Sequence, residues 1–301
     1  MIKLPKIGVG CAALSISSPE TCDIDIERMF EYLLEVGISY FDVAPLYGGG
    51  RGELLLGKAI SRIKQSVAIS TKVGYVGEMP FGGRQLPTDR QKNFSKSSIN
   101  TSILKSLERL GTNYIDIVYL HDPSEHFDTA IGEAFETLVD LKEKGIIGAI
   151  GVGTTSAELA SNIIQKIPIQ ALLLAGQYTL IDQSGRMLLN SLLNSNISVV
   201  IGGVFNSGIL ASDDARNNKL FNYSPASMEV LNFVEKINVT CSGFGVPLKA
   251  AALQFPSTHS ATSTTLLGPR TLKEFQELYK LLKFQIPNSL WDRLKMDYPG
   301  D

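Results

Sequence analysis

The sequence of 301 residues predicts a single-domain (β/α)8 barrel, or TIM barrel, that spans residues 1–301. Short apolar runs alternate with segments of helical spacing, and eight of each can be read along the chain. No linker, repeat or low-complexity tract divides the sequence, and its length is usual for one barrel. A doubly wound open sheet remains the alternative, because a strand count from sequence alone is inexact.

The expected strands are mostly continuous apolar runs. Both faces of a strand in a parallel sheet are covered by other parts of the protein, so successive residues are apolar rather than alternately apolar and polar. In chain order we expect strands at Ile7–Cys11, Ile38–Phe41, Val67–Ser70, Ile115–Leu120, Ile146–Val152, Ala171–Ala175, Ile197–Ile201 and Thr264–Leu267.

The helix expected at Asp128–Lys144 has the clearest pattern of the eight. Its apolar residues fall on one helical face: Ile131, Ala134, Phe135, Leu138 and Leu141. We expect Asp128 to cap its first turn and Gly145 to end it, with lysines in the last turn. The other helices are expected at residues 25–36, 53–63, 97–110, 156–166, 186–195, 226–238 and 271–282.

Two connections are long, residues 73–95 after the third expected strand and residues 203–225 after the seventh. Loops of this length are often functional, and in a barrel the loops that follow strands open on the catalytic face. Both loops are therefore expected to cover a substrate.

The composition argues against several classes of function. The 28 Lys and Arg residues nearly balance the 30 Asp and Glu residues, so no strong positive field predicts nucleic-acid binding. Cys11, Cys22 and Cys241 form no C-x-x-C pair, which argues against a disulfide scaffold. The three histidines offer no i, i+4 pair, so we expect no metal site. No apolar run reaches the ~18 residues of a membrane span, and we expect a cytoplasmic protein whose oligomeric state is not predicted.

Ionisable residues stand where three consecutive apolar strands end. Asp42 follows the second strand, Lys72 the third and His121 the fourth, while Tyr47 lies five residues beyond Asp42. Each residue alone is more often structural, as a helix cap, a solvated lysine or a packed ring. Because the carboxyl ends of parallel strands meet at the barrel mouth, we expect the four side chains to converge there. A buried Lys72 also needs an acidic partner, and Asp42 is the natural one.

These four residue types fit one chemical role. A tyrosine hydroxyl has a pKa of about 10, and an adjacent ammonium lowers that pKa by favouring the phenolate. Lys72 would act in this way on Tyr47, with Asp42 holding the ammonium and His121 orienting a substrate oxygen. Such a site moves one proton at an oxygen while two electrons move at the attached carbon. No side chain carries a hydride, so the sequence implies a nicotinamide cofactor.

Motifs surround each of the four residues. They are F-D-V-A-P-L-Y at 41–47, S-T-K at 70–72 and L-H-D-P at 120–123. Further motifs are L-E-R-L-G at 107–111, I-D-I-V-Y-L-H at 115–121 and L-K-E-K-G…A-I-G-V-G at 141–153. In these motifs the sequence resembles the aldo-keto reductase family. The resemblance implies a (β/α)8 barrel with the cofactor across its mouth, hydride transfer at C4 of the nicotinamide, and Tyr47 as general acid/base.

A narrower likeness lies in five other segments, at 44–53, 173–184, 199–211, 251–256 and 290–294. They resemble the branch that holds D-threo-aldose 1-dehydrogenases, L-fucose dehydrogenases and pyridoxal 4-dehydrogenases. This likeness implies oxidation of a cyclic hemiacetal carbon, such as the anomeric carbon of an aldose, to a lactone. The implied partner is a small sugar or aldehyde.

The resemblance also implies contacts on the nicotinamide side. Gly10 and Cys11 would lie under the cofactor, and Thr154 and Gln177 are candidates for its carboxamide. Gly202 stands where many family members have a stacking tyrosine, so Phe205 is a candidate for the ring contact. Asn206 and Gly208, in the same segment, are further candidates.

The phosphate side resembles the family at G-P-R-T, residues 268–271. Gly268 and the following helix N-terminus suit an anionic group, and Arg270 could pair with a phosphate. Glu274 stands where many NADP-preferring members have a basic or amide side chain. Its carboxylate should repel a 2′-phosphate, so the expected NAD(P) cofactor leans slightly towards NAD.

Other readings stay open. G-V-G-C-A-A at 8–13 satisfies a Rossmann dinucleotide fingerprint, but no clear acidic residue ends a second strand ~20 residues later. A general NADPH-dependent aldehyde or ketone reductase would use the same four residues. A regulatory barrel that binds cofactor with little turnover is a third possibility.

Overall fold

Eight parallel strands close into a barrel in the computed structural model, which describes residues 2–15, 23–62, 66–76, 91–211, 220–222 and 224–297. Around the barrel the strands follow the order β1, β12, β9, β8, β7, β6, β3 and β2. Their bounds are Ile7–Gly10 for β1, Tyr40–Asp42 for β2, Ala68–Val73 for β3, Ile115–His121 for β6, Ile147–Thr154 for β7, Ala171–Ala175 for β8, Ser198–Gly202 for β9 and Thr262–Leu267 for β12. The predicted barrel is confirmed, and the open-sheet alternative is wrong.

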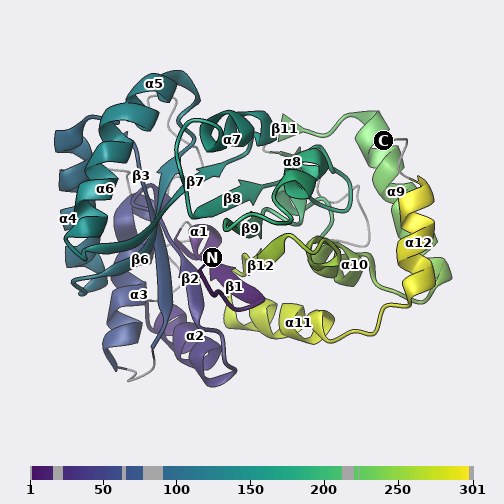
Figure 1. The fold of residues 1–301 in the computed structure, drawn as a ribbon. Coiled ribbons are helices and arrows are strands. Elements are labelled where there is room, and N and C mark those ends of the chain that lie inside the picture. The colour runs from purple at the N-terminus through teal and green to yellow at the C-terminus, as the bar shows by residue number, and fades with distance from the viewer. Residues whose placement is uncertain are drawn as a thin grey trace.

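A helical layer surrounds the strands (Figure 1). Helices at the predicted positions are α2 (Asp23–Glu35), α3 (Arg51–Arg62), α4 (Lys96–Leu110), α6 (Phe135–Glu143), α7 (Ala157–Ile164), α8 (Arg186–Ser191), α9 (Met228–Gly243) and α11 (Leu272–Leu282). Sequence analysis missed α1 (Ala12–Ser15), α10 (Leu248–Gln254) and α12 (Asn288–Asp297). In Figure 1, α12 lies beside α9 at the edge of the molecule, and the two helices pack together.

The helical segment after β6 begins earlier than predicted. A 3-10 turn at Ser124–His126 leads into α5 (Phe127–Thr129), a π-helical turn at 130–134 and then α6. Asp128 therefore lies inside the first helical turn, and the prediction that it caps the helix is wrong. The predicted end is confirmed, because Gly145 follows α6 with a φ of 71° that favours glycine.

The two long connections each carry a short hairpin. Strands β4 (Tyr75–Val76) and β5 (Gln91–Lys92) pair in the first, and β10 (Leu220–Phe221) and β11 (Ser224–Pro225) pair in the second. Sequence analysis predicted neither hairpin. Residues 77–90, 212–219 and 223 of these connections, like Cys22, lie outside the described residues.

Two apolar clusters hold the barrel together. The larger one fills the space between the strands and the helices, with Val9, Phe41, Leu120 and many other buried residues. The smaller one fills the barrel interior and includes Tyr40, Tyr119, Leu173 and Leu266. Side chains alternate between the two clusters along each strand, as the two-residue period of a strand requires. The interior-facing residues at the carboxyl ends of β2, β3 and β6 form the candidate site.

Candidate active site

Lys72 lies buried against Asp42 at the barrel mouth. Its Nζ donates to Asp42 Oδ2 at 2.6 Å and to the carbonyl oxygen of Val43 at 3.0 Å. The two side chains are only 2% and 4% exposed, so each charge depends on the other for compensation. The pair joins neighbouring strands, because Asp42 ends β2 and Lys72 lies near the end of β3. The predicted partnership of these two residues is present in the structure.

Tyr47 lies beside this ion pair. It opens a 3-10 turn at Tyr47–Gly50, in which Gly48 and Gly49 have φ values of 59° and 65° that favour glycine. This turn aims the ring at the ammonium, with Lys72 Nζ at 4.7 Å from the ring centroid. Burial disfavours the charge of Lys72, but Asp42 and Tyr47 together outweigh it and raise the pKa of Lys72 above its ordinary value.

His121 completes the cluster from the end of β6. Its ring meets the Tyr47 ring edge-on, with the centroids 6.3 Å apart, and the side chain is largely buried. The next residue, Asp122, has a φ of 43°, which is unusual for a residue with a side chain. The structure therefore brings together all four residues that the sequence singled out.

Tyr75 is a neighbour of the cluster that sequence analysis missed. Its ring packs edge-on against His121 with the centroids 4.9 Å apart. Lys92, on the paired strand β5, lies over Tyr75 at 5.4 Å and donates to the carbonyl oxygen of Asp122 at 2.8 Å. This lysine thus ties the hairpin to the end of β6. The sequence could have indicated Tyr75 only by its position, because Tyr75 lies in the loop already expected to cover a substrate.

The end of β1 lies next to Asp42, because β1 pairs with β2. Gly10 is the last residue of that strand, and the backbone N–H of Cys11 donates to the Asp42 carbonyl oxygen at 2.8 Å. Burial, and then Asp42, raise the pKa of the Cys11 thiol, which is fully buried and stays neutral. Thr154 ends β7, and its hydroxyl accepts from the backbone N–H of Ser156 at 3.0 Å.

Two amide side chains stabilise the loops after β7, β8 and β9. Gln177 Oε1 accepts from the backbone N–H of Ala157 at 2.5 Å, at the start of α7. Asn206 Nδ2 donates to the carbonyl oxygen of Gly176 and to Asn222 Oδ1, both at 3.0 Å. Asn206 Oδ1 is buried and has no hydrogen-bond partner among the residues that the structure describes. A buried acceptor without a donor is costly, so this atom fits a donor from a bound ligand.

The glycines that sequence analysis placed on the cofactor side have backbone conformations and surroundings that the structure now shows. Gly208 has a φ of 95°, and Phe205, just before Asn206, packs half-buried against the core. An added Cβ at Gly202 would meet its neighbours at no less than 3.8 Å, and one at Gly268 would meet nothing within 4 Å. Neither glycine is crowded by its neighbours, which is compatible with the nicotinamide dinucleotide that the sequence implies.

Arg270 and Glu274, which sequence analysis placed on the phosphate side, pair with each other. Arg270 Nη2 donates to Glu274 Oε1 at 2.7 Å, and the Arg270 backbone N–H donates to Glu274 Oε2 at 2.8 Å. Burial opposes the charge of Glu274, but its bonds to Arg270 lower the pKa of the carboxyl. Thr271 caps α11 by accepting from the Glu274 backbone N–H. Sequence analysis assigned Arg270 to a phosphate and did not predict this pairing.

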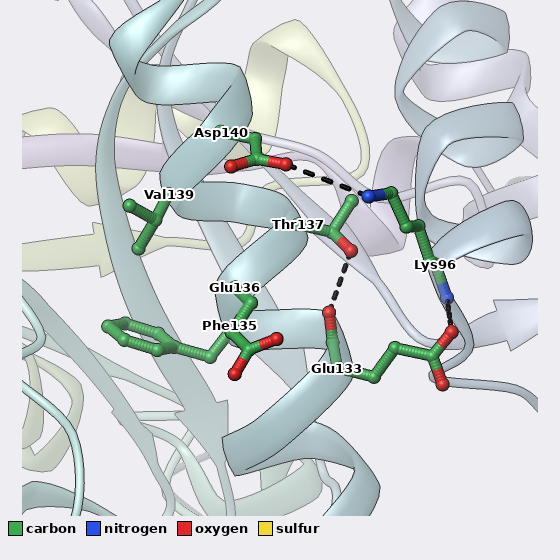
Figure 2. A pocket seen from close by; sticks show the side chains of 7 residues that line it. All are labelled: Lys96, Glu133, Phe135, Glu136, Thr137, Val139 and Asp140. Carbon is green, nitrogen blue, oxygen red and sulfur yellow. Dashed lines mark hydrogen bonds and ion pairs between the residues drawn. The ribbon is translucent and has the colours of Figure 1, made fainter.

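A separate pocket of ≈ 470 Å³ lies on the outer helical layer, between α4 and the segment that ends in α6 (Figure 2). Its polar groups mostly bind one another: Lys96 Nζ lies 3.8 Å from Asp140 Oδ2, and the Lys96 backbone N–H donates to Glu133 Oε1 at 2.7 Å. Thr137 donates to the Glu133 carbonyl oxygen. None of the four clustered residues lines this pocket, so it is not part of the candidate active site.

The described residues lack two kinds of structural feature. They contain no group of three or more His, Cys, Asp or Glu side chains placed to hold a metal ion. Within the same part of the chain, every helix is too short or too polar to cross a membrane.

The chain is similar to a known protein family and to characterised relatives. The model of the Aldo/keto reductase family matches residues 6–296. Pyridoxal 4-dehydrogenase of Microbacterium luteolum is 31% identical, and the alignment covers 98% of this chain and 94% of that protein. D-threo-aldose 1-dehydrogenase of a Pseudomonas species is 29% identical over 97% of this chain and 94% of that protein.

Solved structures agree on the fold. The holo form of an aldo-keto reductase from Bacillus halodurans superposes with a TM-score of 0.81 at 23% identity, covering 97% of this chain and 91% of that one. A glycerol dehydrogenase from Gluconobacter oxydans gives 0.75 at 20% identity, over 98% of this chain and 94% of that one. From the family model and these near full-length relatives, the chain belongs to the aldo/keto reductase family and is an NAD(P)-dependent oxidoreductase that acts on CH–OH or C=O groups.

Proposed function

We propose that this protein oxidises the anomeric carbon of an aldose of the L-fucose or D-threo-aldose type, or the carbon of a similar cyclic hemiacetal, to a lactone. One observation carries the chemistry, the buried Lys72–Asp42 pair next to Tyr47. The substrate class is supported by the two relatives above, whose names specify an aldose and pyridoxal as substrates.

Tyr47 is the general base in this proposal. The pKa of a tyrosine is ordinarily about 10, and the ammonium of Lys72 favours the phenolate by direct electrostatic attraction. The phenolate accepts the proton of the anomeric hydroxyl as the C–H bond at that carbon breaks. A bound NAD(P)+ supplies the acceptor for the hydride at C4 of its nicotinamide. His121 donates a hydrogen bond to the substrate oxygen and holds it against Tyr47.

The first test is the absorbance of reduced nicotinamide at about 340 nm. The protein is mixed with NAD or NADP and with L-fucose, other aldoses and pyridoxal in turn. Reduced cofactor is expected with at least one sugar. No oxidation of any of them, combined with consumption of NADPH by simple aldehydes, would replace the proposal with a general reductase. Cofactor binding without turnover in either direction would favour a regulatory barrel.

The second test removes the titrating oxygen and keeps the ring. Tyr47→Phe is expected to lower kcat about 100- to 10,000-fold, the usual range for a general acid/base. Tyr114→Phe is the matched control, because Tyr114 precedes β6 and so lies at the opposite end of the barrel. Near wild-type turnover by Tyr47→Phe would exclude the assigned mechanism.

The cofactor preference is proposed to be NAD. Glu274 engages both the side chain and the backbone of Arg270, so that guanidinium is partly neutralised at the start of α11. Glu274→Gln should release Arg270 and raise the ratio of kcat/KM for NADP over NAD by roughly tenfold, equivalent to about 1.4 kcal/mol. Glu277→Gln, one turn further along and paired with Lys249, is the control. An unchanged ratio in Glu274→Gln would show that Glu274 does not read the ribose.

A further inference from the structure

A line of buried hydroxyl groups runs through the barrel interior to Asp42. Tyr119 OH lies 3.3 Å from Tyr40 OH, and Tyr40 OH lies 2.9 Å from Ser70 Oγ. Ser70 Oγ in turn donates to Asp42 Oδ1 at 2.8 Å, on the oxygen that Lys72 does not use. The side chains come from β6, β2 and β3, and the residues of all three hydroxyls are 0% exposed.

The hydrogen bonds along this line of hydroxyl groups all run in one direction, towards Asp42. Asp42 is ionised because it pairs with Lys72, so it only accepts hydrogen bonds and Ser70 must donate to it. A serine hydroxyl has one hydrogen, so Ser70 accepts from Tyr40. The same count applied to Tyr40 makes Tyr119 its donor. Three hydroxyls are thus aligned towards one carboxylate, and each orients the next.

The barrel is built to admit these two tyrosines. A Cβ added at Gly8 would lie 2.5 Å from Cδ1 of Tyr40, and one at Gly151 would lie 2.6 Å from Cδ1 of Tyr119. Both glycines therefore leave space that the rings occupy. Burial first, and then the neighbouring Asp42, raise the pKa of Tyr40, and burial also raises that of Tyr119. Both phenols stay protonated and remain hydrogen-bond donors.

Other titratable groups face Asp42 and Tyr47 from each packed element. Lys72 contacts both from β3, and His121 faces Tyr47 from β6. Cys11, after β1, lies close to Asp42 but is held as a neutral thiol. The charge balance at Tyr47 is therefore governed by the Lys72–Asp42 pair. The line of hydroxyl groups acts on that pair through Asp42 Oδ1.

We propose that Ser70, Tyr40 and Tyr119 are positioning residues that act on Tyr47 through Asp42 and Lys72. This inference rests on the proposed role of Tyr47 as the general base. Ser70 takes up part of the negative charge of Asp42, so Lys72 is not fully neutralised by its partner. The remaining positive field stabilises the Tyr47 phenolate. Without Ser70, Asp42 would compensate Lys72 more completely, and the phenolate would form at higher pH.

The test is the pH dependence of kcat for oxidation in a graded series of variants. Ser70→Ala should move the pH of half-maximal kcat upwards by about 0.5–1 unit and lower kcat at pH 7 by about 3- to 10-fold. Tyr40→Phe should raise the pH of half-maximal kcat by a smaller amount. Tyr119→Phe should raise it least, because Tyr119 is the hydroxyl furthest from Asp42 along the line. KM should change little, because all three hydroxyls belong to fully buried residues that a substrate does not reach.

Matched controls separate this role from packing. Ser198→Ala removes a serine hydroxyl of β9 that donates to the carbonyl oxygen of Ile2 at 2.8 Å. Tyr279→Phe removes a hydroxyl that donates to the carbonyl oxygen of Val36, outside the barrel interior. Both controls should leave the pH midpoint unchanged. Ser70→Thr, which keeps a hydroxyl at the same position, should restore most of the midpoint lost in Ser70→Ala.

The outcomes distinguish this inference from the proposed function. If Tyr47→Phe abolishes turnover while Ser70→Ala and Tyr40→Phe, folded as judged by thermal unfolding, keep the wild-type midpoint, the inference alone is overturned. If Tyr47→Phe stays active, the proposed function fails and the inference fails with it. Should Ser70→Ala not fold, Tyr40→Phe and Tyr119→Phe carry the test, because each removes one oxygen and leaves the ring.

Discussion

Removal of Arg109 is expected to leave a buried negative charge in the layer between barrel and helices. Glu53, in α3, is 0% exposed, and its Oε2 accepts from Arg109 Nε at 2.7 Å and lies 2.6 Å from Nη2. Its other oxygen accepts from Thr71 Oγ1 at 2.6 Å. Gly50 makes room for this arrangement, since a Cβ there would lie 2.5 Å from Arg109 Nε. Three elements thus meet at one carboxylate.

The expected loss of unfolding free energy follows from how deeply Glu53 and Arg109 are each buried. Breaking a buried ion pair by removing one partner costs about 3–5 kcal/mol, because the remaining charge is uncompensated. The Arg109 side chain is 26% exposed, so water can reach part of the space that it leaves. We therefore expect Arg109→Met to lower the free energy of unfolding by about 3 kcal/mol, the lower end of the range. Adding Glu53→Gln should recover roughly half of that loss by removing the charge.

Urea unfolding followed by circular dichroism measures these free energies in a double-mutant cycle of the two positions. The control is Lys96→Met, whose Nζ lies 3.8 Å from Asp140 Oδ2, with the two side chains 63% and 52% exposed. An exposed pair of this kind is worth less than about 1 kcal/mol. A loss below about 1 kcal/mol in Arg109→Met as well would refute the argument that Glu53 depends on Arg109.

Two further predictions concern stability. Gly151→Ala should cost about 3 kcal/mol, because its Cβ would lie 2.5 Å from the Ala171 carbonyl oxygen; Gly132→Ala, with nothing within 4 Å, should cost nothing in the same urea assay. Burial, and then Arg186, lower the pKa of His259, whose Nδ1 accepts from Ala261. Its neutral form stabilises the fold above the ordinary His pKa of about 6.5, and this contribution is lost as pH falls through the lower folded pKa. His259→Asn should flatten the fall in unfolding temperature between about pH 7 and 5, and an unchanged slope would contradict the assignment.

The strands and the clustered residues could be predicted because one physical rule governs both. Strands buried on both faces read as continuous apolar runs, and a charged residue at the end of such a run is visible against them. Asp42, Lys72 and His121 are each the last or next-to-last residue of an observed strand. The parallel barrel then brings these ends together without any information about side-chain contacts.

The elements that sequence analysis missed have no clear pattern of apolar and polar residues. Helix α10 is buried on nearly every side and follows Pro247 without a side-chain cap, so its sequence shows no amphipathic period and no capping signal. The hairpins β4–β5 and β10–β11 pair only two residues per strand, too few to produce an alternating pattern. Because β4 was missed, Tyr75 could not be placed against His121.

Arg270 and Glu274 have the i, i+4 spacing of residues that meet on a helix surface. Arg270, however, precedes α11, and only the structure shows that its backbone N–H also engages Glu274. The contact of Gln177 could not be predicted from its residue type either. An amide oxygen that can bind a cofactor carboxamide can equally accept from the N–H groups at the start of a helix, as Gln177 does at α7. Residue type alone cannot separate these two uses.

The S-T-K motif shows how one strand supports both carboxylates. Successive residues of a strand face opposite sides, so Ser70 and Lys72 point into the barrel and Thr71 points out. The two inward residues bind the two oxygens of Asp42, and Thr71 binds Glu53 in the helix that begins directly after the Tyr47 turn. Three consecutive polar residues are tolerated at the centre of the protein because each has a buried carboxylate to bind. The same strand therefore fixes the ammonium beside Tyr47 from one face and, from the other, the helix that follows the Tyr47 turn.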